Sequence, residues 1–184
     1  MVEGGPAQQA VIIPGGRGGP YAGLLAYASA VAARRGAKLE LIWWTPPEDR
    51  PMVDNWLWVH DQVTSVVEKL PSSPTPVLIG KSLGSYGAGV AAVRALPAVW
   101  LTPLLTKPAC AEALSRATEP FLLVGGTGDD YWDGGLAREL TPHVLEVADA
   151  DHGMMVPGPL RGSGEVLGQV LTAIETFLND VVWR

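Results

Sequence analysis

Residues 76–89 read Pro-Val-Leu-Ile-Gly-Lys-Ser-Leu-Gly-Ser-Tyr-Gly-Ala-Gly, and this stretch decides the expected fold. The apolar run 77–79 is too short for a helix and ends at Gly80, while the small residues after Gly84 begin a helical segment. We therefore expect a strand, a sharp turn and a helix. Ser82 stands at the apex of the turn, where a glycine two residues away on either side lets strand and helix pass closely.

The G-x-S-x-G spacing around Ser82 is typical of a nucleophile elbow, a strained turn that exposes a serine hydroxyl. The chain has 22 glycines, so the spacing alone is suggestive only, and a serine that caps the following helix is the competing interpretation. A phosphate-binding loop is a third interpretation. It requires a glycine five residues before Gly80, where Thr75 stands, so the sequence disfavours it.

Length and composition indicate a compact globular protein. The chain has 184 residues, of which 47% are hydrophobic and 17% charged. We expect a single domain spanning residues 1–184, with residues 1–9 as a loose leader. The net charge of -6 disfavours a nucleic-acid partner, because such binding needs a basic face.

The single cysteine, Cys110, cannot form an internal disulfide, which favours a reducing compartment. The first ten residues lack the basic and apolar regions of a signal peptide, and the chain has no apolar run of 18 residues. We therefore expect a cytoplasmic protein without a membrane partner, present as a monomer or a homodimer.

Short apolar runs predict six strands, at 10–13, 39–44, 77–79, 98–101, 121–124 and 144–147. Helical spacing predicts helices between successive strands and a long C-terminal helix capped by Ser163. Strands that alternate with helices form a mostly parallel sheet covered on both faces, a three-layer α/β/α sandwich. The carboxyl ends of its strands meet at one edge, where ligands bind in such sheets.

An activated serine needs a base within hydrogen-bond reach and a carboxylate that orients the base. The chain has three histidines. His60 falls within a predicted helix and His143 at the start of a strand, at the wrong edge of the sheet, whereas His152 follows the last strand. Three scattered histidines and one cysteine give no metal-binding spacing, so we expect neither a metal nor another cofactor.

The order Ser82, an acidic residue after the fifth strand, and His152 is that of the α/β-hydrolases. The chain resembles this superfamily, in particular its small lidless serine hydrolases of the dienelactone-hydrolase-like and short-chain esterase type. The resemblance extends from Val11 to the end of the chain. It rests on Pro-Gly-Gly at 14–16, Gly-Lys-Ser-Leu-Gly at 80–84, Gly-Gly-Thr-Gly-Asp-Asp at 125–130 and Asp-His-Gly at 151–153.

The resemblance implies a catalytic triad in which Ser82 is the nucleophile, His152 the base and Asp129 the orienting acid. Asp130 and Asp133 remain alternatives for the acid. The implied activity is that of a serine esterase that cleaves small carboxylic esters or thioesters through an acyl-enzyme. The alternative is a non-catalytic α/β-hydrolase-fold protein that binds a ligand or serves as a scaffold.

The backbone N–H of Leu83 is expected to form half of the oxyanion hole, because the residue after the nucleophile starts a helix. The resemblance places the other half at Gly16, with Arg17 as the alternative donor. Relatives often have His-Gly where this chain has Pro14-Gly15.

Trp44 and Trp132 follow strands at the same edge and are candidates for lining an acyl pocket, although aromatic residues are more often found in the core. Lys81, next to Ser82, is interpreted as a surface-facing residue of the turn. The sequence between Ser82 and the acidic residue has no insertion long enough for a lid.

Overall fold

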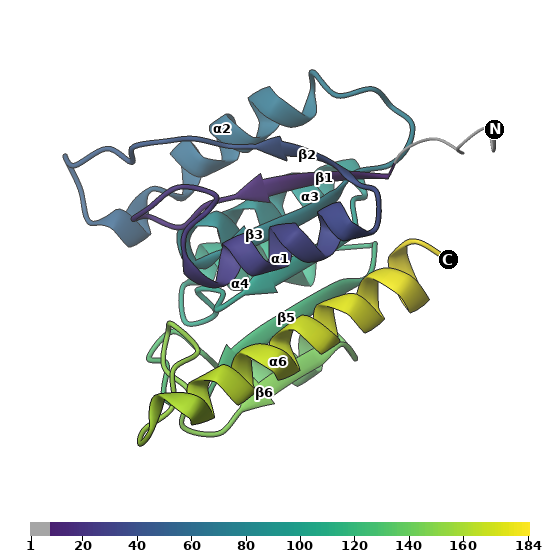
Figure 1. Cartoon of the computed structure of the whole chain (residues 1–184). Helices are drawn as coiled ribbons and strands as arrows, with labels where there is room; N and C mark the ends of the chain where they lie inside the picture. The colour runs from purple at the N-terminus through teal and green to yellow at the C-terminus, as the bar shows by residue number, and fades with distance from the viewer. Residues whose placement is uncertain (1–7) are drawn as a thin grey trace.

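The protein folds around one six-stranded sheet, seen in a computed structural model that describes residues 8–184 (Figure 1). The strands are β1 (Gln9–Ile13), β2 (Lys38–Leu41), β3 (Val77–Lys81), β4 (Ala98–Leu101), β5 (Phe121–Gly126) and β6 (Val144–Val147). Their order in the sheet is β2-β1-β3-β4-β5-β6, and every neighbouring pair is parallel. The predicted three-layer α/β fold is confirmed.

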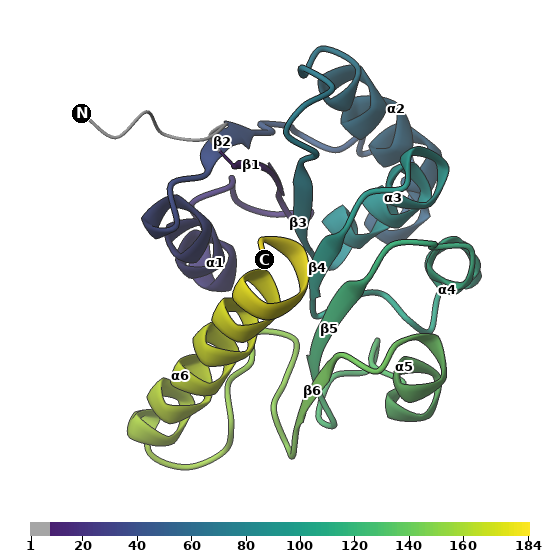
Figure 2. The same cartoon turned by 90° about the vertical axis from the view of Figure 1, so that its right-hand side faces the viewer.

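Helices cover both faces of the sheet (Figure 2). One face carries α1 (Gly23–Arg34) and α6 (Leu160–Phe177). The other carries α2 (Trp56–Val67), α3 (Ala88–Arg94), α4 (Pro108–Ser115) and α5 (Gly134–Leu140). Three short helical segments complete the chain, η1 (Met52–Asp54), η2 (Ser82–Gly87) and the π-helical η3 (Leu178–Val182).

The core lies on the two faces of the central strands. Ile12 and Ile79 are fully buried on the side of α1 and α6, while Leu78 and Trp100 are buried on the opposite side. Strands buried on both faces consist of continuous apolar runs, because no position along them faces water. This is why the strand at 98–101, buried at all four positions, has the predicted bounds. The edge strand at 144–147 also has the predicted bounds, although it is only partly buried.

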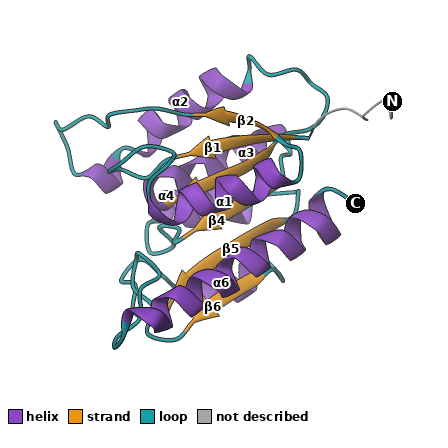
Figure 3. Cartoon of the chain, in the orientation of Figure 1, coloured by secondary structure: helices purple, strands orange, loops and turns teal. Residues whose placement is uncertain are grey.

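The sheet brings the loops that follow its strands to one edge, where Figure 3 shows them in teal. The loops after β1, β3, β5 and β6 carry the residues predicted to form a site. Within residues 8–184, no helix combines the length and the hydropathy that crossing a bilayer requires.

The structure corrects several of the predicted elements. The predicted strand 39–44 ends at Leu41. The backbone N–H of Ile42 still donates to the carbonyl of Ile12 in β1, and the chain then leaves the sheet before Pro46-Pro47. Gln9, placed in the leader, belongs to β1, and residues 1–7 of that leader lie outside the described residues. The helix after Ser82 begins as the tighter η2. Ser163 lies inside α6, whose N-cap is Pro159, and the Ser163 hydroxyl accepts a hydrogen bond from the backbone N–H of Val156 instead.

Candidate active site

Ser82 lies at a strained turn between β3 and η2. Its φ of 51° is in the left-handed region, which residues other than glycine seldom adopt. A Cβ on Gly84 would lie 2.6 Å from the carbonyl oxygen of Ile13, and one on Gly80 would lie 2.9 Å from that of Gly84. Glycine is therefore required at both positions for β1, β3 and η2 to pack this closely.

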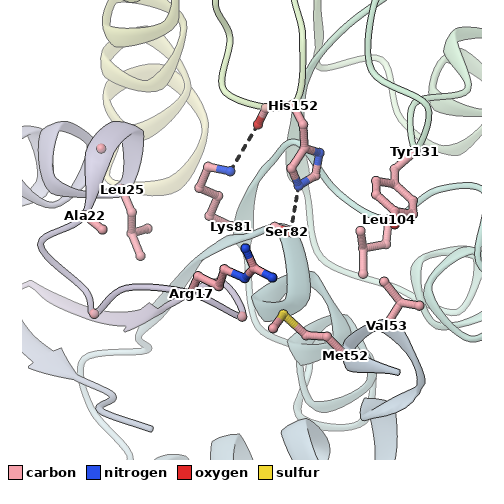
Figure 4. Close-up of a pocket in the computed structure, with 14 residues that line it drawn as sticks. Arg17, Ala22, Leu25, Met52, Val53, Lys81, Ser82, Leu104, Tyr131 and His152 are labelled. Atoms are coloured by element: carbon pink, nitrogen blue, oxygen red, sulfur yellow. Dashed lines mark hydrogen bonds between the residues drawn. The ribbon is translucent and has the colours of Figure 1, made fainter. Parts of the chain in front are cut away.

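Ser82, His152 and Asp129 form one chain of hydrogen bonds. Nε2 of His152 lies 2.7 Å from Oγ of Ser82 (Figure 4). Nδ1 of the same ring lies 2.7 Å from Oδ2 of Asp129. With the proton on Nδ1, the ring donates to the carboxylate and accepts from the serine hydroxyl. The Ser82 hydroxyl is thus directed at the imidazole rather than capping a helix. The three residues come from loops at the ends of three strands.

Asp129 is the one of the three candidate acids that reaches His152. Its side chain is 1% exposed, and its second oxygen, Oδ1, accepts a hydrogen bond of 2.9 Å from the backbone N–H of Tyr131. Asp130 is exposed. Asp133 caps α5, where it accepts a hydrogen bond from the backbone N–H of Leu136. A buried carboxylate held from both sides fixes the orientation of the ring.

Lys81 is not the surface-facing residue that the sequence interpretation made it. Its ammonium group points along the cavity wall and donates to the backbone carbonyl of His152 at 3.1 Å and to Oγ1 of Thr102 at 3.2 Å (Figure 4). Burial lowers the pKa of the Lys81 ammonium, and the negative charges of Asp129 and Asp151 oppose that shift. Lys81 thereby ties the loop of His152 to the end of β4.

The loop around His152 is also ordered from within. Oδ1 of Asp151 accepts hydrogen bonds from the backbone N–H groups of Gly153 and Met155, at 2.7 and 2.9 Å. The ring of Tyr131 meets the imidazole edge-on, with 5.3 Å between ring centroids. The hydrogen bonds fix the backbone of the His152 loop, and Tyr131 contacts the imidazole ring from one side.

Ser82 and His152 open onto a cavity of about 530 Å³. Its wall is formed by Gly15, Gly16, Arg17, Gly19, Ala22, Gly23, Leu25, Met52, Val53, Lys81, Ser82, Leu104, Tyr131 and His152. This volume falls within the range usual for small-molecule sites, which are mostly apolar with a few polar groups. The cavity can therefore hold a small organic molecule against the Ser82 hydroxyl.

The two residues predicted for the oxyanion hole flank Ser82. Gly16 and its alternative, Arg17, both line the cavity. Leu83 follows Ser82 within η2, with its side chain buried. A Cβ on Gly16 would lie 1.7 Å from Sδ of Met52, so this turn is packed directly against η1.

Neither tryptophan predicted to line an acyl pocket contributes to the cavity wall. The Trp44 indole turns back to donate to the carbonyl of Gly15 at 2.9 Å and packs on Trp58. The Trp132 indole is buried over Gly125 and donates to Glu146 at 2.7 Å. Both positions follow strands at the correct edge, but their side chains face the core.

Sequence reasoning missed Met52 and Val53, which form the cavity wall opposite α1. They lie in η1, which is three residues long and leaves no periodic pattern. The hydroxyl of Tyr86 in η2 donates to the carbonyl of Val53 at 2.5 Å and fixes η1 beside Ser82. Their position after the second strand, at the edge where ligands bind, was the available signal.

Among residues 8–184, no group of three or more histidine, cysteine, aspartate or glutamate side chains is arranged to hold a metal ion. The polar side chains in the cavity wall are those of Arg17, Lys81, Ser82, Tyr131 and His152.

Comparison with known proteins gives matches to structures but not to sequences. No family model matches the chain, and no curated protein matches its sequence. Est1E from Butyrivibrio proteoclasticus, solved with ferulic acid bound, superimposes with a TM-score of 0.71 at 14% identity. The match covers 97% of this chain and 91% of Est1E.

Two further structures show the same likeness. Dienelactone hydrolase from Anabaena variabilis matches with a TM-score of 0.69 at 17% identity, over 96% of this chain and 88% of that one. A serine hydrolase without a lid from Xanthomonas campestris matches with a TM-score of 0.61 at 14% identity, over 100% and 87%. The chain has the α/β-hydrolase fold in its small, lidless form.

Proposed function

We propose that the protein is a serine hydrolase that cleaves small carboxylic esters or thioesters through an acyl-enzyme. The observation that carries the proposal is the hydrogen-bonded chain from Ser82 through His152 to the buried Asp129, at 2.7 Å for each link, in the wall of a cavity. The matches to Est1E and dienelactone hydrolase support it at the level of the fold. The ferulic acid bound to Est1E supports a small-molecule ligand.

In the first half of the reaction, the Ser82 oxygen attacks the carbonyl carbon of the ester while His152 Nε2 takes the hydroxyl proton. Asp129 stabilises the resulting imidazolium through Nδ1–H. The backbone N–H of Leu83 and one from the turn at Gly16 bind the negative oxygen of the tetrahedral intermediate. His152 then gives its proton to the leaving alcohol or thiol, and the acyl group stays on Ser82.

In the second half, a water molecule replaces the alcohol. His152 takes a proton from the water, whose oxygen attacks the acyl carbon, and the same donors hold the second oxyanion. Collapse of this intermediate returns the proton to Ser82 and releases the carboxylic acid. Each proton transfer uses Nε2, the nitrogen that faces Ser82 and the cavity.

The proposal is tested by release of p-nitrophenol from p-nitrophenyl acetate and butyrate. Wild-type protein should hydrolyse both, and Ser82→Ala should lose about 10³-fold or more in turnover. Ser115→Ala, an exposed serine in α4, is the matched control and should behave as wild type. A rate that Ser82→Ala leaves unchanged would be background hydrolysis and would favour a non-catalytic binding protein of the same fold.

A further inference from the structure

The charges in the cavity wall have one sign. Arg17 and Lys81 are the arginine and lysine side chains among the 14 lining residues, and none of the 14 is acidic. The chain as a whole carries a net charge of -6. Two cations beside the serine, in a protein with an excess of acidic residues, make this cavity a region that attracts negative charge.

Arg17 is exposed, and its guanidinium points into the cavity toward Ser82 (Figure 4). Within residues 8–184, the Arg17 guanidinium forms no ion pair within 4.0 Å and no side-chain hydrogen bond. The arginines that do pair with a carboxylate are Arg35, Arg50, Arg94, Arg138 and Arg161. Glu48 lines a neighbouring hollow with Arg17 and Arg50 but lies beyond ion-pair distance of Arg17.

Lys81 adds a second positive charge that protein carboxylates do not neutralise at close range. The hydrogen-bond partners of its ammonium group are two neutral oxygens, of Thr102 and of the His152 backbone. Burial lowers the pKa of this group, with Asp129 and Asp151 opposing the shift. An anion bound in the cavity would favour the charged form of the ammonium, so binding of the anion and protonation of Lys81 reinforce each other.

We propose that the cavity recognises esters whose acyl part carries a carboxylate a few atoms from the scissile bond, held by the Arg17 guanidinium. This inference rests on the proposed hydrolase function. The planar guanidinium can donate two parallel hydrogen bonds to a carboxylate. Lys81 contributes a second positive charge in the same cavity wall. The apolar side chains of Leu25, Met52 and Val53 then contact the carbon chain between the carboxylate and the ester.

The kinetic test compares two p-nitrophenyl esters that differ in one charge. The first is mono-p-nitrophenyl glutarate, which has a free carboxyl group, and the second is methyl p-nitrophenyl glutarate, in which that carboxyl is methylated. At pH 7 the free carboxyl of the first is ionised. Arg17→Gln should lower the ratio of kcat/KM for the anionic over the neutral ester by roughly tenfold or more, and Arg17→Lys should restore part of it. Arg34→Gln removes the same charge from the far end of α1 and should leave the ratio unchanged.

Two results would overturn the inference. In one, both esters lose rate equally in Arg17→Gln, which would mean that the guanidinium acts on the reacting oxygen rather than on a distant carboxylate. In the other, the ratio does not move at all. If the wild-type protein hydrolysed neither ester in a way that depends on Ser82, this would contradict the proposed function instead. Measurements of ligand binding would then decide whether the cavity recognises a carboxylate.

Binding is measured without catalysis, by NMR titration of Ser82→Ala protein with monomethyl glutarate and with dimethyl glutarate. The inference predicts saturable binding of the anion that weakens as salt is raised and is lost in Ser82→Ala/Arg17→Gln. Binding of both compounds with equal affinity, binding unchanged by the second substitution, or no saturable binding of the anion would each contradict it.

Discussion

The Lys81 ammonium donates a hydrogen bond to the backbone carbonyl of His152 across 3.1 Å, so the residue that precedes the proposed nucleophile holds the loop of the proposed base. The same ammonium reaches Thr102 just after β4, so Lys81 ties the ends of β3 and β4 to the loop that follows β6. The relative position of Ser82 and His152 is therefore fixed by a side chain as well as by the sheet.

Replacing Lys81 should loosen this arrangement. In Lys81→Met the carbonyl of His152 loses its partner, and we expect kcat for a neutral ester to fall roughly 10- to 100-fold with a smaller change in KM, because misplacement of about 1 Å costs this much. Lys81→Arg should retain part of the activity. Lys69→Met, at an exposed lysine in the turn after α2, is the control. A wild-type kcat in Lys81→Met would rule out the positioning role.

Asp129→Asn should reduce turnover by about 10³ to 10⁴, because the amide favours the wrong imidazole tautomer and cannot stabilise the imidazolium. Asp130→Asn should have little effect, since that side chain is exposed. Asp133→Ala should cost about 1 kcal/mol of stability through the lost cap of α5 without a comparable loss of turnover. Steady-state kinetics and urea unfolding distinguish the three. A large loss of turnover in Asp130→Asn alone would transfer the role to Asp130.

The contact between Gly16 and Met52 gives a third prediction. A Cβ at Gly16 would lie 1.7 Å from the Met52 sulfur, so Gly16→Ala must displace either η1 or the turn that carries the proposed oxyanion donor. We expect kcat/KM to fall, and we expect Gly16→Ala/Met52→Ala to recover part of the loss because the truncated side chain leaves room. Failure of the double variant to recover any activity would show that the space at Met52 is not what limits Gly16→Ala.

Alkaline pH should destabilise the protein through Cys110. Burial raises the pKa of its thiol from the ordinary 9.0 to about 11, with hydrogen bonds from Ser85 and the Leu104 backbone acting in the opposite direction. Between these pH values the Cys110 thiol of the unfolded chain loses its proton while that of the folded chain keeps it, and this favours the unfolded state. Below pH 9 the thiol is protonated in both states, so the free energy of unfolding is undiminished there. It then falls by about 2 kcal/mol as the pH rises to 11.

Urea unfolding of wild type and Cys110→Ser at pH 8 and pH 10.5 measures this contribution. The serine does not titrate in this range, so the variant should lose less stability than wild type between the two values. Lys81 is present in both proteins and cancels in the difference. Tyr86 is also present in both, and burial, the main cause of its raised pKa, is common to them, while the smaller effect of the Cys110 charge on Tyr86 counts as part of the Cys110 contribution. Equal losses in the two proteins would mean that the thiol does not contribute.

The parts of the fold and site predictable from sequence were those set by the backbone. Apolar runs between helices place the ends of parallel strands at one edge, and this alone brings the loops of Ser82, Asp129 and His152 together. The glycines at 80 and 84 could be understood in advance because a tight turn excludes a Cβ whatever surrounds it.

The predictions that failed concerned where side chains point. Trp44 and Trp132 follow the correct strands, but their indoles turn toward Gly15 and Glu146, partners that only the tertiary structure supplies. Lys81 was interpreted as surface-facing because its partners, Thr102 and His152, are 21 and 71 residues away in the sequence. Met52 was missed because a three-residue turn has no periodicity.

The most direct test of the central claim is labelling with a fluorophosphonate probe followed by peptide mapping. Such a probe reacts with a serine whose hydroxyl is activated by a neighbouring base, and only Ser82 has His152 Nε2 at 2.7 Å among the described residues. We predict one modification per chain, on Ser82, that disappears in Ser82→Ala and is strongly slowed in His152→Ala. Intact protein without label, or a label on Ser85, would contradict the assignment of Ser82 as an activated nucleophile.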